Sequence, residues 1–379
     1  MPRSYHRPEG EAVNDVVREA MGRLVDLPAL HRALMRLPGY EDVPLSALAP
    51  LPEKGLAHDH VRIGGKGVLL RVPRQSQFGF SARDNLAYQK ACFERCQPSG
   101  HTPALLGILE PSRDLPMGAL LVERIDGVVL SLPDDMAGIV ACLAAIHTLP
   151  VPPTGERAPL QEHREAVAGT LAIVRRQALG LEVAGLDSEA RVQIEAELAW
   201  ARDFAAEAAS RPQPLALVLS DTHPGNYLRE ASGRVVCVDL EKVVYGAPAI
   251  DLAHASLHTS TTWDVEAAAS LPRGAIESFY AAYLKLLPPA MREALMPWLL
   301  PLRRLTWLRS VTWCVHYRVE SAKARQREKH LAAATEDWSS EDVDAALTAH
   351  VEGRVVDYLD PATIAAIRAE WLGPDRLSF

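Results

Sequence analysis

Two short apolar runs in the middle of this 379-residue chain each lead to an aspartate, and a turn lies between them. The first run, 215–219, ends at Asp221, and the second, which is rich in valine, ends at Asp239. Pro224 and Gly225 stand in the intervening turn. Runs of this length between turn residues predict a strand, a loop and a second strand, with polar groups at the ends of the strands.

The spacing of the polar residues in this unit matches one kind of chemistry. Asn226 stands five positions after Asp221, as in the catalytic loop of kinases, and Asp239 follows on the next hairpin. In phosphoryl transfer one carboxylate accepts or orients the attacking hydroxyl, while an amide oxygen and a second carboxylate hold Mg²⁺ on the phosphates. Each residue alone could be an ordinary turn residue. All three at these spacings, with Pro and Gly between them, favour the catalytic interpretation.

The composition is typical of a soluble globular protein. Hydrophobic residues make up 48% of the chain and charged residues 23%, and the net charge of -8 argues against a nucleic-acid partner. No stretch approaches the roughly 20 apolar residues of a membrane span. The five cysteines lack the spacing of a zinc site and fit a reducing compartment, so we expect a cytoplasmic protein, whose oligomeric state stays open.

The hydrophobic period changes along the chain and predicts two lobes. Four short apolar runs between residues 60 and 123 indicate an antiparallel sheet, interrupted by a helix from Ser81, its N-cap, to Arg95. Helical patterns cover 11–37, 137–149, 187–211, 249–258, 264–286, 289–320, 340–357 and 361–371. We therefore expect an α+β fold, with an N-terminal helix and β-rich lobe over 1–124 and a larger helical lobe over 125–379. The cleft between such lobes is the natural ligand site.

Three segments together resemble a known family. Asp221-Thr-His-Pro-Gly-Asn226, Val238-Asp239-Leu-Glu241 and Ile250-Asp251-Leu-Ala are similar to motifs of the aminoglycoside phosphotransferase and choline kinase family, and Ala144-Ala-Ile-His147 resembles the Leu-His signature after its interlobe hinge. That family has a protein-kinase-like fold. The resemblance implies a Mg²⁺-dependent kinase that transfers the γ-phosphate of ATP or GTP to a hydroxyl of a small molecule, and it does not identify the acceptor.

The resemblance also implies roles for residues of the helical lobe. Asp221 takes the place of the catalytic carboxylate, and Asn226 and Asp239 take the places of the Mg²⁺ ligands. Asp251 takes the place of a buried aspartate that braces the catalytic loop. We interpret His223 as a structural brace of the same loop.

In the β-rich lobe the resemblance points to the nucleotide. Gly55 and His58 fall in the phosphate-covering loop between the first two strands, where glycine permits close backbone approach. Arg71 replaces the third-strand lysine that pairs with phosphates, and an arginine can form a bidentate fork there. A second departure precedes the catalytic aspartate, where Leu219-Ser220 replaces the family's His-Gly.

A basic and aromatic segment late in the chain suggests where the acceptor binds. Arg303, Arg304, Trp307 and Arg309 lie in a predicted helix of the lobe that lines the acceptor pocket in this fold. They predict an anionic or planar acceptor. The alternative is that these aromatic and charged residues belong to the core and to a solvated face.

Two other functions compete with a small-molecule kinase. A nucleotide-binding pseudokinase that regulates a partner would fit Leu219 and Arg71, whereas the retained Asp221, Asn226 and Asp239 favour an enzyme. A protein kinase is disfavoured, because the chain between Asp239 and the next helix leaves no room for an activation segment. The histidines lack a compact metal-ligand spacing.

Overall fold

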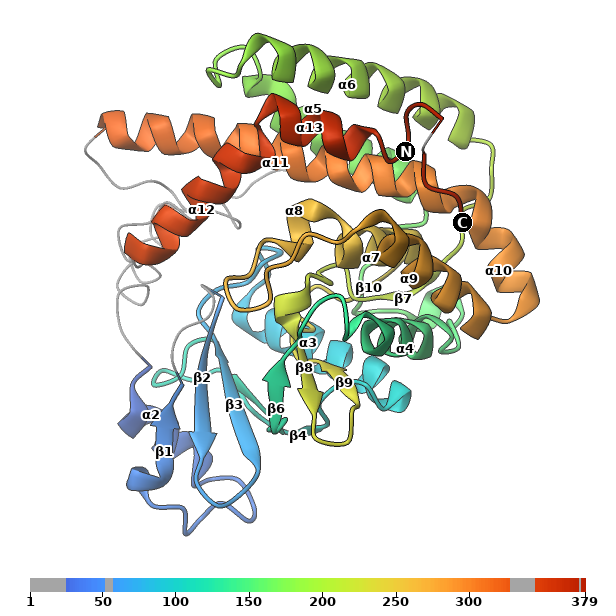
Figure 1. Ribbon diagram of the computed structural model, residues 1–379. Helices are drawn as coiled ribbons and strands as arrows, with labels where there is room; N and C mark the ends of the chain where they lie inside the picture. The colour runs from blue at the N-terminus through green and yellow to red at the C-terminus, as the bar shows by residue number, and fades with distance from the viewer. Residues whose placement is uncertain (1–24, 52–56, 328–344, 375) are drawn as a thin grey trace.

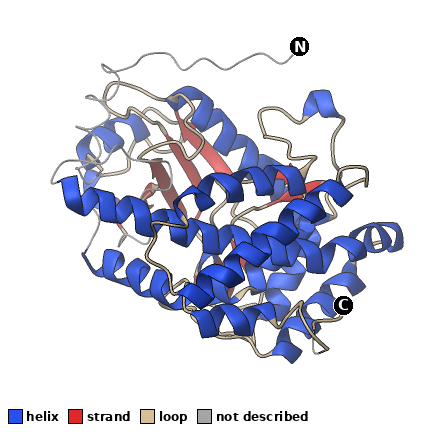
Figure 2. Cartoon of the chain, turned by 90° about the horizontal axis from the view of Figure 1, so that it is seen from above, coloured by secondary structure: helices blue, strands red, loops and turns tan. Residues whose placement is uncertain are grey.

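The computed structural model describes residues 25–51, 57–327, 345–374 and 376–379. An antiparallel sheet forms the first part of the chain, and most of the remainder is helical (Figure 1). Viewed from above, helices cover most of the molecule and the strands lie between them (Figure 2). The chain therefore has the predicted α+β architecture of a small sheet lobe and a larger helical lobe.

The main sheet contains the four predicted strands and one further edge strand. Its order is β1–β2–β3–β5–β4, and every neighbouring pair is antiparallel. The strands are β1 (Leu48–Pro50), β2 (His58–Ile63), β3 (Val68–Pro73), β4 (Leu105–Leu109) and β5 (Ala119–Glu123).

Alternation along the strands decides which side chains face the helical lobe. Leu70 and Leu121 pack with α2 (Leu27–Leu34) in a small core, whereas Leu120 belongs to the main core of the molecule. Because successive side chains in a strand point to opposite faces, Arg71 points away from the small core that holds Leu70. The sheet thereby directs a guanidinium toward the helical lobe.

Helix α3 (Ala82–Cys96) crosses the sheet and begins as predicted. The Ser81 hydroxyl oxygen accepts a hydrogen bond from the backbone N–H of Asp84 at 3.2 Å, which satisfies one of the free donors of the first turn. The helix packs against β4 and β5 and buries Gln89 on its inner side.

Five further strands build two small sheets beside the helices. β7 (Ala216–Val218) pairs with β10 (Val244–Gly246), while β8 (Tyr227–Glu230) lies between β6 (Gly127–Val129) and β9 (Val235–Cys237). The two strands that lead to the aspartates are thus in different sheets. The loops that follow them nevertheless meet, because the N–H of Val238 donates to the carbonyl of Asn226 at 2.9 Å.

The helical lobe departs from the predicted helices at three places. The helix expected over 264–286 begins only at Arg273, and the one expected over 289–320 is interrupted by a 3₁₀ turn at Met296–Trp298, because Pro297 cannot continue the hydrogen-bond ladder. The helix at 166–177 was not expected. The helices are α4 (Met136–His147), α5 (Ala166–Gln177), α6 (Ser188–Ala208), α7 (Pro248–Ser256), α8 (His258–Thr261), α9 (Arg273–Leu286), α10 (Pro289–Leu295), α11 (Leu299–Arg327), α12 (Ala345–Tyr358) and α13 (Pro361–Arg368).

Parts of two predicted helices cannot be compared. Residues 11–24 of the predicted N-terminal helix and 340–344 of the late one lie outside the described residues. Within the described ranges, no helix is both long and apolar enough to cross a membrane.

Candidate active site

Asp251 on α7 holds the loop that precedes Asp221. Its carboxylate accepts the backbone N–H of Leu219 at 2.6 Å and that of Ser220 at 2.8 Å, and its carbonyl accepts the Thr222 hydroxyl at 2.7 Å. The Asp251 side chain is fully buried. A buried carboxylate requires such donors, and in return it fixes the backbone of the loop.

Two further buried side chains, His147 and Tyr283, support Asp251. His147, at the end of α4, lies with Nε2 at 3.1 Å from the Asp251 carboxylate and with Nδ1 at 2.7 Å from the Tyr283 hydroxyl on α9. The loop therefore rests on a chain of three buried polar side chains from three helices. Leu219, which stands where the family has histidine, contributes only its backbone to this arrangement.

Ser220 adopts a left-handed backbone conformation with φ of 65°. This conformation costs an L-residue roughly 1–2 kcal/mol, and glycine avoids that cost. We expect Ser220→Gly to keep the fold, with a change of at most about 1 kcal/mol in the free energy of unfolding, because the greater flexibility of unfolded glycine offsets the relief. Ser220→Val should lower the melting temperature clearly, since a β-branched residue is a severe outlier there. Equal melting temperatures for both variants in calorimetry would contradict the strain.

Asp221 lies among groups that can carry positive charge. Its carboxylate accepts a hydrogen bond from Lys242 Nζ at 3.1 Å, and the nearest nitrogens of His223 and His254 are each 3.9 Å away. Burial raises the pKa of Asp221, but the positive charges of Lys242 and the two histidines outweigh it and hold the pKa well below the usual range. An ionised carboxylate of this kind can orient a hydroxyl by accepting its hydrogen bond.

Asn226 and Asp239 lie on adjoining loops beside Asp221. The Asn226 amide nitrogen donates to the Asp221 carbonyl at 3.0 Å, while its amide oxygen accepts no hydrogen bond from the described residues. Asp239 directly follows the residue that pairs with the Asn226 backbone. Burial raises the pKa of Asp239, and the charge of Arg71 more than reverses this effect, so Asp239 is also a carboxylate at neutral pH.

Arg71 bridges the sheet lobe and the helical lobe. From β3 its guanidinium donates to Asp239 Oδ1 at 2.7 Å and to the Val238 carbonyl at 3.2 Å, and only 4% of the residue is exposed. Its Nε is buried and finds no partner among the described residues. The arginine therefore occupies the site and still has a donor to give to a ligand.

Apart from Asp239, three titratable side chains around Arg71 are mainly neutral at neutral pH. Burial and the charge of Arg71 hold the pKa of His58 well below its usual range and lower that of His60 to about 4. Burial and the charge of Asp239 raise the pKa of Glu241 to about 8. From α3, the neutral Gln89 side chain forms a hydrogen bond with His58 at 3.1 Å.

Two of the arginines predicted to contact an acceptor are instead used inside the protein. Arg303 is fully buried and donates to Glu370 at 2.6 Å and to the Ser256 hydroxyl at 2.7 Å. Arg304 donates to the buried Glu197 and stacks on Trp200, with its guanidinium 3.9 Å from the ring centre.

Trp307 likewise belongs to the core. It is fully buried against Trp371, with ring centres 5.3 Å apart. The structure thus corrects the prediction for Arg303, Arg304 and Trp307, because helix composition does not reveal that acidic partners arrive from α6 and from the C-terminal segment. Arg309 lies further along α11, and its charge contributes to lowering the pKa of His254. Gly55 lies outside the described residues.

The sequence did not single out Lys242 and His254, which both lie beside Asp221. Lys242 follows Asp239 by three residues, and His254 follows Asp251 by three, which places it on the same side of a helix. The spacing of three residues from Asp251 is therefore the sequence feature that could have identified His254. No comparable pattern identifies Lys242, since its position depends on the path of the chain after β9.

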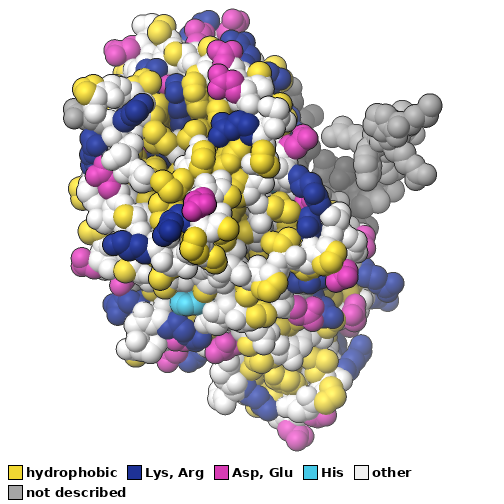
Figure 3. All heavy atoms as spheres, turned by 90° about the vertical axis from the view of Figure 1, so that its right-hand side faces the viewer, with side chains coloured by type: hydrophobic (Ala, Val, Ile, Leu, Met, Phe, Trp, Pro, Cys, Tyr) yellow, Lys and Arg dark blue, Asp and Glu magenta, His cyan; other side chains and the backbone are white. Residues whose placement is uncertain are grey.

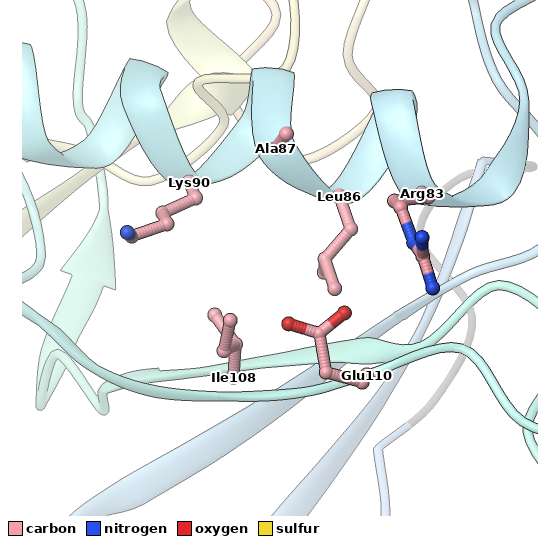
Figure 4. Close-up of a pocket in the computed structure, with 6 residues that line it drawn as sticks. All are labelled: Arg83, Leu86, Ala87, Lys90, Ile108 and Glu110. Atoms are coloured by element: carbon pink, nitrogen blue, oxygen red, sulfur yellow. The ribbon is translucent and has the colours of Figure 1, made fainter.

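A separate hollow of about 410 Å³ lies between α3 and β4 (Figure 4). The helix contributes residues at the spacing of one helical face, and they point toward β4 and the residue after it. The lining residues are Arg83, Leu86, Ala87, Lys90, Ile108 and Glu110. None of these residues is a predicted site residue, and Gln89 does not line the hollow.

Comparisons with solved structures agree with the fold. A Plasmodium vivax ethanolamine kinase superposes with a TM-score of 0.57 at 11% identity, over 95% of this chain and 97% of that one. A choline kinase from Cryptosporidium parvum gives 0.55 at 13%, over 91% and 98%. The GDP complex of aminoglycoside 2'-phosphotransferase-IIIa gives 0.54 at 15%, over 86% and 98%. These likenesses identify a protein-kinase-like fold.

Sequence comparison identifies the family. No curated protein sequence matches the chain. The model of the phosphotransferase enzyme family matches residues 51–298, which include β2 to β5 of the main sheet, the loop of Asp221 and the helix of Asp251. This match covers more than half of the chain, and so the protein belongs to the phosphotransferase enzyme family.

Proposed function

We propose that the protein is a Mg²⁺-dependent kinase that transfers the γ-phosphate of ATP or GTP to a hydroxyl of a small molecule. Family membership supports a small-molecule phosphotransferase. The observation that carries the finer proposal is the meeting of Asp221, Asn226 and Asp239 with Arg71 where the two lobes adjoin. The solved relatives named for choline, ethanolamine and aminoglycosides leave the acceptor of this chain open.

The residues present fit a magnesium ion. Asp239 and Asn226 offer a carboxylate and a free amide oxygen, and Mg²⁺ takes oxygen ligands, usually one or two from protein and the rest from phosphates and water. Glu241 Oε2 is buried without a hydrogen-bond partner among the described residues. In the described ranges, no group of three or more His, Cys, Asp or Glu side chains is arranged to hold a metal ion without other ligands. Bound there, Mg²⁺ would neutralise phosphate charge.

Asp221 and Arg71 would have separate roles in the reaction. Asp221 would orient the acceptor hydroxyl, whose oxygen bonds to the γ-phosphorus while the bond to the bridging oxygen breaks. The nucleoside diphosphate leaves, and the hydroxyl proton is released. Arg71 would hold phosphate oxygens with its fork, exchanging its bond to Asp239 for them. Catalysis would come mainly from positioning and charge neutralisation.

The test combines nucleotide binding with a search for transfer. We expect calorimetry to detect ATP or GTP binding that disappears with EDTA, and mass spectrometry to detect one phosphate added to a hydroxyl compound in a metabolite pool. Absence of Mg²⁺-dependent nucleotide binding would overturn the proposal. Binding without transfer to any member of the pool, and without Asp221-dependent hydrolysis, would favour a regulatory pseudokinase.

Substitution of Arg71 should separate charge from shape in nucleotide binding. We expect Arg71→Ala to weaken Mg-nucleotide binding by about tenfold or more, since a charged hydrogen bond contributes roughly 1.5–3 kcal/mol. Arg71→Lys should restore part of the affinity, because lysine keeps the charge but loses the planar fork. Titration calorimetry measures both, with the exposed Arg202→Gln on α6 as the control. Wild-type affinity in both Arg71 variants would remove the phosphate role.

A further inference from the structure

Arg309 is a half-buried cation whose side chain has no partner among the residues that the structure describes. It lies on α11, which packs along α7, the helix of Asp251 and His254. Earlier on the same helix Arg303 and Arg304 both hold glutamates, but the Arg309 side chain forms no hydrogen bond or ion pair within the described part of the chain. Partial burial of a charge is unfavourable without compensation, so this guanidinium suits an anionic ligand.

The surroundings of Arg309 place it at the candidate active site. Its charge acts on His254, whose Nδ1 lies 3.9 Å from Asp221, and on His163, whose backbone N–H donates to the Tyr245 carbonyl at 2.7 Å. Burial, together with Arg309, lowers the pKa of both histidines. The geometry of this side of α11 agrees, because Trp313, one turn after Arg309, contacts Trp263, and the adjacent Asp264 lies against Gly225 of the Asp221 loop.

Nitrogen-bearing side chains outnumber free carboxylates around this loop. Lys242, His223 and His254 surround Asp221, and His223 Nδ1 is buried without a hydrogen-bond partner among the described residues. The neighbouring Asp264 lies against Gly225, but its carboxylate accepts the N–H groups of the two residues of its own turn, at 266 and 267. By contrast, the face of the molecule in Figure 3 mixes both signs of charge among apolar side chains.

Two tryptophans give Arg309 an apolar neighbour. Trp313 follows Arg309 by four residues, which places both on one side of α11. Its ring lies 5.7 Å from that of Trp263 at an interplanar angle of 81°, and both rings are only half-buried. A ligand held by Arg309 would therefore also find aromatic surface, which suits a compact planar or ring-shaped body.

We propose that the acceptor is an anion: a small molecule that carries a carboxylate or a phosphate besides the hydroxyl to be phosphorylated, with Arg309 binding the anionic group. This proposal rests on the kinase function proposed above and names its substrate class. The guanidinium matches the two oxygens of either anion. A cationic acceptor such as choline would instead meet like charge at Arg309 and Lys242.

The test uses probes that differ in charge but share one skeleton. These are 4-(hydroxymethyl)benzoate, 4-(hydroxymethyl)phenyl phosphate, 1,4-benzenedimethanol and 4-(hydroxymethyl)benzylamine, each with a planar ring and a primary hydroxyl. Calorimetry on the full chain without nucleotide measures their affinity. We expect at least one anionic probe to bind at millimolar concentration and about ten- to hundredfold more tightly than the neutral one. The stronger of the two anions distinguishes carboxylate from phosphate.

Variants of Arg309 test whether this residue causes the preference for anionic probes. Arg309→Gln should remove the preference, and Arg309→Lys should keep part of it. Both should retain the melting temperature and Mg-nucleotide affinity of the wild type, as should the exposed control Arg202→Gln, which should also keep the preference. Equal binding of all probes, tighter binding of the amine, no binding of either anion, or an unchanged order in Arg309→Gln would each overturn the proposal. Nucleotide binding, measured separately, decides the kinase function whatever the probes do.

Discussion

Replacing Asp221 by asparagine is expected to lower phosphoryl transfer by about 10²–10⁴-fold while leaving Mg-nucleotide affinity near that of the wild type. Asparagine keeps the shape of the side chain but loses the negative charge that Lys242, His223 and His254 surround. The backbone of the loop should not move, because Asp251 holds it through its N–H groups rather than through the Asp221 side chain.

Single-turnover transfer and nucleotide titration measure the two effects. Asp187→Asn makes the same chemical change at the N-cap of α6, where asparagine and aspartate serve about equally well, so it should match the wild type in both assays. If Asp221→Asn transferred phosphate as fast as the wild type, Asp221 would have no role in orienting the acceptor.

Replacing Arg303 by alanine is expected to lower the free energy of unfolding by about 3–5 kcal/mol, the usual loss when one partner of a buried ion pair is removed. Arg303 is fully buried and Glu370 keeps little exposure, so the carboxylate would be left with poor solvation. The Ser256 hydroxyl and carbonyl would lose their donors as well.

Chemical denaturation measures the loss, and a double variant checks its cause. Arg303→Met with Glu370→Gln removes both charges and should recover part of the stability, because no unpaired charge remains. The acceptor KM of folded Arg303→Ala should equal that of the wild type. A raised acceptor KM with unchanged stability would instead support the predicted role of Arg303 in binding the acceptor.

Local patterns predicted the sheet and the central residues of the site. The strands around Arg71 are short apolar runs between glycines or prolines, and Ser81 marks the start of α3 through ordinary capping. Asp221, Asn226 and Asp239 could be connected because their chemistry depends on spacing within a single stretch of chain. Such features are encoded within a few residues, so one sequence suffices to find them.

The remainder depends on contacts that sequence spacing does not contain. Glu197 lies more than one hundred residues before Arg304, and only the fold shows that the two pair. Arg303 and Arg309 look alike in the sequence of α11, yet one is fully buried and the other is half-buried. Helix periodicity also missed the interruption at Pro297, because the apolar pattern continues on both sides of it.

The pairing of Arg71 with Asp239 has a consequence for how a charged ligand approaches. Two opposite charges 2.7 Å apart present a dipole to distant ions, and the field of a dipole falls off faster than that of a single charge. The electrostatic attraction between Arg71 and an anion is therefore weak until the anion reaches the site. We expect the association rate of a nucleotide to depend only weakly on ionic strength, and the dissociation rate to carry most of the contribution of Arg71.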